Sequence, residues 1–129
     1  MTDAKILELD NILHEENPDA LAIIDSGSLS ENSEKLKNHF LDFQLKTMKR
    51  GRQISSGMIV GVKKSLTCSF KIVKEMTKTD LLEACNVCIW KEGQKLSCNI
   101  LYNPPSNLAN YDVLPIEENC ITFGDFNSP

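Results

Sequence analysis

The sequence predicts an α+β (mixed α/β) fold with a mostly antiparallel sheet. Three observations support this: an amphipathic helix pattern at the N-terminus, about six strand patterns further along the chain, and a hairpin signal within the β region. The chain has 129 residues, of which 41% are hydrophobic and 25% charged, as in soluble globular chains. This length allows one domain at most.

The N-terminal region predicts one helix followed by an apolar strand. Thr2 or Asp3 caps the helix, in which apolar residues recur at spacings of three and four up to Leu13. Pro18 ends it, because proline disfavours helical geometry in the residue before it. Since Ala20–Ile24 is continuously apolar, we expect a strand buried on both faces in a central position of a sheet.

The rest of the chain predicts one short helix, from Ser30 to about Phe40, and then strands. The expected strands cover Phe43–Thr47, Gly57–Val62, Thr67–Val73, Leu81–Trp90, Leu96–Tyr102 and Cys120–Phe123. Lys91–Gln94 contains a glycine and predicts a hairpin turn. Asn103–Asn107 is expected to be a rigid loop, and Leu108–Leu114 a short helical turn.

No membrane or secretory signal is apparent. The longest apolar run has five residues, whereas a membrane span needs about 20. We therefore expect an intracellular protein in a reducing compartment. The five cysteines agree, because an odd number cannot all pair within one chain. Cys85 and Cys88 form a C-x-x-C that leaves a zinc or redox role open, but we expect reduced, mostly buried thiols.

Charge is distributed unevenly along the chain. The net charge is −4, yet residues 43–80 carry nine basic side chains against two acidic ones. Such a basic region is able to neutralise phosphates, and the residues considered for nucleic-acid binding are Lys49, Arg50, Arg52, Lys63 and Lys64. The alternative is a set of solvated strand edges, on which lysine discourages aggregation.

Polar side chains follow three apolar strands at the points where these strands are expected to end. They are Asp25 with Ser26, Tyr102 with Asn103, and Asp125 with Asn127. Ligands in α/β sheets bind outside the carboxyl ends of the strands. If the strands are neighbours, the two carboxylates could bind a hard cation, and Tyr102 and Asn127 a phosphate. Each residue also has a plainer interpretation as a turn, cap or packing residue.

Four segments in order resemble the endonuclease/exonuclease/phosphatase superfamily. They are Asn17–Ser26 with its N-P-D start, the glycine-containing strand Ser56–Lys63, Ile100–Pro105 with its Tyr-Asn-Pro-Pro, and Ile121–Asn127 with its GDFN. The sequence is most like the endonuclease domain of jockey-type non-LTR retrotransposons, in which a reverse transcriptase follows. The resemblance implies a partial four-layer α/β/β/α sandwich.

The resemblance also implies metal-dependent phosphodiester hydrolysis on DNA, with Mg²⁺ or Mn²⁺ as the cofactor. By position, Asp125 would orient and deprotonate the attacking water, Asn127 would hydrogen-bond the scissile phosphate, and Tyr102 would stabilise charge developing there. Asp25 would take the place of the family's metal-binding glutamate, although it is one methylene shorter. These roles suit phosphoryl chemistry, which needs a cation to neutralise charge and a carboxylate to accept a proton.

Residues 1–129 are expected to form an incomplete domain of this kind. The family's opening strand has no match, and neither do the C-terminal strands that carry its Ser-Asp-His motif. His14 and His39 lie in the two expected helices and do not replace that histidine. Because such residues act together, we expect little or no nuclease activity from the chain as given. Open edges and apolar surface are expected to make it poorly soluble.

The preferred hypothesis is a fragment of a DNA endonuclease from a non-LTR retrotransposon reverse transcriptase polyprotein, forming a monomeric domain whose full-length parent acts in the nucleus. One alternative is a non-catalytic nucleic-acid-binding remnant of the same scaffold, with salt-dependent DNA binding and no Mg²⁺-dependent nicking. A phosphoesterase of the same superfamily that acts on small molecules or lipids, and a zinc or redox role for the C-x-x-C, also remain open.

Overall fold

The computed structural model describes residues 3–24, 26, 37–49 and 56–126 of the chain. The elements are α1 (Asp3–Glu16), β1 (Ala20–Ile24), β2 (Phe43–Met48), β3 (Met58–Lys63), β4 (Thr67–Lys74), β5 (Glu83–Lys91), β6 (Gln94–Tyr102), the 3₁₀ helix η2 (Tyr111–Val113) and β7 (Cys120–Asp125). The expected strands are confirmed to within about two residues at their ends. Of the expected second helix only its end is described, where residues 37–39 are helical. No described helix has the length and apolar character that crossing a membrane requires.

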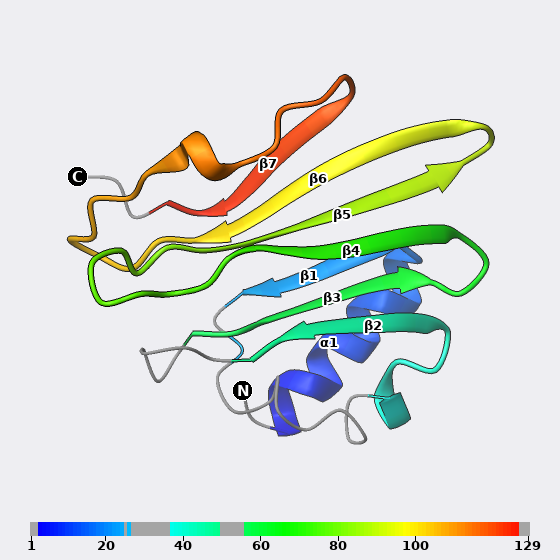
Figure 1. Cartoon of the computed structure of the whole chain (residues 1–129). Helices are drawn as coiled ribbons and strands as arrows, with labels where there is room; N and C mark the ends of the chain where they lie inside the picture. Colours follow the sequence, from blue (N-terminus) through cyan, green and yellow to red (C-terminus); the bar gives the residue numbers. More distant parts are fainter. Residues whose placement is uncertain (1–2, 25, 27–36, 50–55, 127–129) are drawn as a thin grey trace.

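The strands form two sheets that pack face to face, with α1 on the outside of one of them (Figure 1). Sheet A has the order β1-β3-β2 and sheet B the order β4-β5-β6-β7. Among the described strands, only β6 and β7 run parallel. The predicted α+β fold with mostly antiparallel sheets is confirmed.

The main core lies between the two sheets. Its buried side chains are Met48, Met58, Val60 and Val62 of sheet A and Cys85, Val87, Cys98, Ile100 and Tyr102 of sheet B. On the other side of sheet A, Ile6 of α1 packs against Phe40 and Ile59. Among the described residues, the outer face of sheet B is covered by the chain between β6 and β7, which contains η2.

The expectation that Ala20–Ile24 lies centrally in its sheet is wrong. In the described part of the chain β1 pairs with β3 and no other strand, at the edge of sheet A, and its residues are half-buried. Ala22 and Ile24 pack against the main core, while Ile23 packs on the side of α1. A continuous apolar run indicates that both faces of a strand are covered, but it does not indicate how many strands lie beside it.

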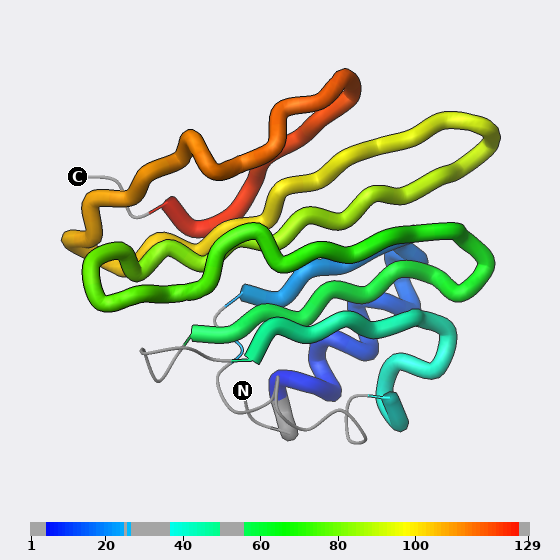
Figure 2. The backbone as a smooth tube through the Cα atoms, viewed as in Figure 1, coloured from blue at the N-terminus to red at the C-terminus, as the bar shows by residue number. Residues whose placement is uncertain are grey.

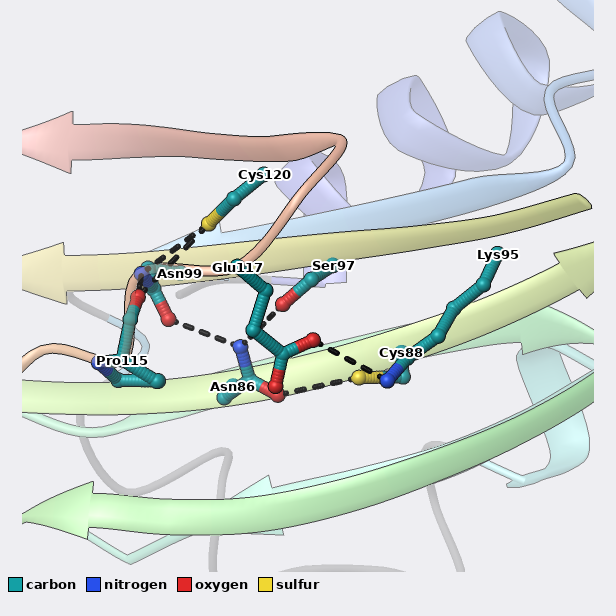
Figure 3. A network of polar contacts seen from close by, with 8 residues as sticks. All are labelled: Asn86, Cys88, Lys95, Ser97, Asn99, Pro115, Glu117 and Cys120. Carbon is teal, nitrogen blue, oxygen red and sulfur yellow. Dashed lines mark hydrogen bonds and ion pairs between the residues drawn. The ribbon is translucent and has the colours of Figure 1, made fainter.

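A ladder of buried polar side chains fastens the β6–β7 connection to the outer face of sheet B (Figure 3). Asn86 Nδ2 donates to Ser97 Oγ (2.9 Å) and to Asn99 Oδ1 (2.8 Å). Asn99 Nδ2 in turn donates to Pro115 O (2.7 Å). Figure 2 shows the segment 103–119 running back along sheet B to the start of β7. This return path is what allows two consecutive strands to be parallel.

Gly124 is required where β7 approaches β6. Its φ is +150°, a backbone conformation that favours glycine. A Cβ atom at this position would lie 2.0 Å from Leu101 O. The GDFN segment therefore requires glycine at this position, because no side chain fits against the neighbouring strand.

Gly124→Ala is expected to lower the free energy of unfolding by more than about 2 kcal/mol, since the added methyl group meets backbone that cannot move aside. Gly93→Ala in the β5–β6 turn is the matched control. Gly93 also has a positive φ (+77°), but no atom lies within 4 Å of the added Cβ, so only conformational strain of about 1 kcal/mol is expected. Urea denaturation compares the two variants, and equal destabilisation would contradict the close-approach explanation.

Candidate active site at one end of the sandwich

Tyr102 and Asp125 lie side by side at the ends of the parallel strands β6 and β7. They are partners in the register of the two strands, so their side chains point to the same face of sheet B. Tyr102 is 6% exposed and belongs to the main core, whereas Asp125 is exposed. The structure therefore brings together two of the predicted site residues, one fixed by the core and one open to solvent.

The end of β1 lies at the same end of the sandwich (Figure 1). Ile24, the last residue of β1, pairs with Met58, the first residue of β3. Two residues beyond the end of β1, Ser26 N donates to Gly57 O at 3.2 Å. Two of the predicted residues, Asp25 and Asn127, lie outside the described residues, and their places remain predictions.

Glu83 joins the two sheets at this end, and it is not among the site residues predicted from the sequence. It is 1% exposed and pairs with Tyr102 across β5 and β6. Its Oε1 accepts a hydrogen bond from Gly57 N at 2.9 Å. Glu83, Tyr102 and Asp125 thus form one row across three strands. The pairing of Glu83 with Tyr102 could have been predicted from the hairpin turn at Gly93, because residues equally distant from the turn pair with each other.

Asn103 fastens the ends of both parallel strands. This side chain is 3% exposed. Asn103 N donates to Asp125 O (2.8 Å), and its Nδ2 donates to Phe126 O (3.1 Å). Asn107 Nδ2 donates to Asn103 Oδ1 (2.7 Å) and to Asp80 Oδ1 (2.9 Å). The Asn-Pro-Pro loop is therefore part of the support of the site as well as a rigid connection.

The carboxylate of Asp80 anchors this support. Burial acts to raise the pKa of Asp80, but hydrogen bonds from the Asn107 side chain and from the N–H groups of Leu82 and Asn110 favour the charged form. The net effect is a pKa below the ordinary value of 3.8. Ionised Asp80 therefore stabilises the folded state.

Asp80→Asn is expected to make the free energy of unfolding less dependent on pH in the acidic range. Because the pKa of Asp80 is lowered by folding, its contribution is complete above its ordinary pKa and is lost as the pH falls below it. Urea midpoints of the wild-type chain should therefore fall more steeply than those of Asp80→Asn between about pH 5 and pH 3. Asp112→Asn, at an exposed position in η2, is the control. Parallel midpoint curves for wild type and Asp80→Asn would show that the network does not favour the charged form.

The predicted nucleic-acid-binding residues are divided between the two ends of the sandwich. Lys49 follows β2 at the candidate-site end, where it and Glu83 line a cavity of about 480 Å³. Lys63 and Lys64 lie at the opposite end of β3. Two further predicted residues, Arg50 and Arg52, lie outside the described residues. The length of β3 therefore separates Lys49 from Lys63 and Lys64.

The two cysteines of the C-x-x-C face opposite sides of sheet B. They are three residues apart in β5, so their side chains alternate. Cys85 contacts Met58 Sδ (3.9 Å) in the main core, while Cys88 donates to Asn86 Oδ1 (3.4 Å) on the outer face. Burial raises the pKa of Cys85 to about 12. The two thiols are therefore not placed to share one metal ion, and all five cysteines are free thiols.

The described oxygen ligands at the candidate site are of the type that a hard cation prefers, but they are too few to hold one. Asp125 offers an exposed carboxylate. Ser26 Oγ is buried and has no hydrogen-bond partner within the described part of the chain, and such a group is a typical neighbour of a bound ion or water. However, the described residues contain no group of three or more His, Cys, Asp or Glu able to hold a metal ion. They do not form a complete metal site by themselves.

Two solved structures similar to this chain are both of TDP2 from D. rerio. TDP2 complexed with a single-strand DNA product gives a TM-score of 0.66 at 14% identity, over 96% of this chain and 54% of that one. TDP2 humanized by 14 mutations gives 0.59 at 15% identity, over 74% and 41%. The chain thus spans about half the length of these TDP2 chains. No protein-family model matches the sequence, and no curated protein does either. TDP2 is a member of the endonuclease/exonuclease/phosphatase superfamily, and this chain has the fold of that superfamily.

Proposed function

We propose that the chain is part of a metal-dependent DNA endonuclease that hydrolyses phosphodiester bonds. The observation that carries this proposal is the pair of Tyr102 and Asp125 in register at the ends of β6 and β7. The fold agrees, and the TDP2 complex with a single-strand DNA product supports DNA as the substrate class. The Tyr-Asn-Pro-Pro and GDFN segments support a non-LTR retrotransposon polyprotein as the parent.

In the proposed reaction, the exposed carboxylate of Asp125 orients a water molecule and takes its proton. The hydroxyl of Tyr102 donates to a phosphate oxygen, and its ring has little freedom because it belongs to the main core. Asn127 is proposed to hydrogen-bond the scissile phosphate and Asp25 to hold the cation. Mg²⁺ or Mn²⁺, when bound, supplies neutralisation of the phosphate charge.

We further propose that residues 1–129 alone have little or no activity. The two histidines line a cavity of about 580 Å³ at the other end of the sandwich, together with Lys63. There His39 Nδ1 lies 3.0 Å from Asp10 Oδ2. Both described histidines thus lie away from the ends of β6 and β7, so neither is proposed to supply the phosphate contact that the family's histidine makes.

Asp125→Ala is expected to abolish Mg²⁺-dependent nicking of supercoiled plasmid, since loss of a general base costs about 100-fold or more in rate. Asp42→Ala, at an exposed position of the opposite end, is the control and should match the wild-type chain. Because slow nicking is expected, a second measurement is the broadening of backbone amide signals by Mn²⁺. It should reach Asp125 and Tyr102 in the wild-type chain and disappear in Asp25→Ala, because Asp25 is the proposed ligand of the cation. Nicking that survives Asp125→Ala would rule out the proposed base.

A non-catalytic nucleic-acid-binding role is the second candidate, favoured by Lys49, which lines the cavity at the candidate-site end. If DNA binds at the candidate-site end, Lys49→Ala should weaken single-stranded DNA binding and reduce the slope of its salt dependence by about one counterion. Lys64→Ala, at the opposite end, should change little. Salt-dependent binding without Mn²⁺ broadening at Asp125 would favour this candidate. A larger loss of DNA affinity in Lys64→Ala than in Lys49→Ala would indicate that DNA binds at the opposite end.

A further inference from the structure

We propose that Glu83 is a positioning residue of the candidate site, whose carboxylate holds the end of sheet A against the row formed by Tyr102 and Asp125. The meaning of that row rests on the proposed function. The hydrogen-bonded link itself does not, and it is tested separately below.

The link consists of two hydrogen bonds in series. Glu83 Oε1 accepts from Gly57 N at 2.9 Å, and Gly57 O accepts from Ser26 N at 3.2 Å. It leads from the first residue of β5 in sheet B, through the residue before β3, to the residue that follows position 25 in the chain. One side chain of sheet B is thereby linked to Ser26, two residues beyond the end of β1 in sheet A.

The burial of Glu83 indicates a specific role. The inward-facing residues that follow it in β5 are apolar, namely Cys85 and Val87 in the main core. At the end where Tyr102 and Asp125 lie, the inward-facing position of β5 is instead occupied by the carboxylate of Glu83. Burying a carboxylate costs free energy unless it is hydrogen-bonded, so packing alone would favour an apolar side chain here.

The backbone of Gly57 is shaped for this bond. Its φ is +110°, in the region that favours glycine, and its N–H is directed to β5 while its carbonyl faces Ser26. At the opposite end of the sandwich an exposed ion pair, Lys91 Nζ to Asp19 Oδ2 at 2.6 Å, joins the sheets instead. That pair offers a matched control, because it links the same two sheets away from the site.

Amide hydrogen exchange measured by NMR tests the link. In Glu83→Ala, exchange of the Gly57 and Ser26 amides should be about tenfold faster or more, as expected when a buried bond worth about 1–2 kcal/mol is lost. The Lys63 amide at the other end should be unchanged. Glu83→Gln keeps an acceptor oxygen and should restore most of the protection. Asp19→Ala should leave Gly57 and Ser26 as in wild type.

Uniformly faster exchange along the whole chain, or unchanged exchange at Gly57, would overturn the positioning role. If Glu83→Ala does not fold, Glu83→Gln alone decides. The Gly57 amide proton signal must move upfield when a charged acceptor becomes neutral, and an unchanged signal refutes the link.

Mn²⁺ titration connects the link to the site. Glu83→Ala should need a several-fold higher Mn²⁺ concentration for half-maximal broadening at Asp125, and Glu83→Gln should stay close to wild type. Normal Mn²⁺ broadening in Glu83→Ala would overturn the positioning role and leave the proposed function intact. No broadening in the wild-type chain would instead overturn the proposed function, whatever the amide exchange shows.

Discussion

The parallel pairing of β7 with β6 is the constraint on which the candidate site depends. Parallel neighbours end at the same edge of a sheet, so the last residues of the two strands, Tyr102 and Asp125, meet. Two features maintain this arrangement. Asn99 fastens the returning segment to sheet B, and Gly124 lets β7 approach β6 more closely than any side chain would allow. Asn103, directly after β6, then donates hydrogen bonds to the carbonyl oxygens of Asp125 and Phe126 at the end of β7.

Much of this architecture could be predicted from the sequence, because its signals are local. The spacing of apolar residues identified α1, and the glycine-containing turn between β5 and β6 identified the hairpin that sets their register. The positions of Tyr102 and Asp125 at strand ends also followed from pattern. That these two ends are adjacent was an expectation from the resemblance to a family, since nothing local tells which strands are neighbours.

The remaining features could not be predicted because they depend on contacts between distant segments. The apolar run of β1 indicated two covered faces but gave no sign that the strand lies at an edge. Asn86 and Asn99 alternate with apolar residues as exposed positions do, yet they are buried under the β6–β7 connection. The bond from Gly57 to Glu83 joins residues 26 positions apart in different sheets, and no spacing rule covers it.

A crystal structure of the chain grown with Mn²⁺ and a 5′-nucleotide, with the metal located by anomalous scattering, would show most directly whether metal and phosphate bind at the ends of β6 and β7. We expect a metal peak beside the carboxylate of Asp125 and a phosphate oxygen within hydrogen-bond distance of the Tyr102 hydroxyl. A metal and nucleotide bound only at the opposite end, near Lys63 and His39, would contradict it.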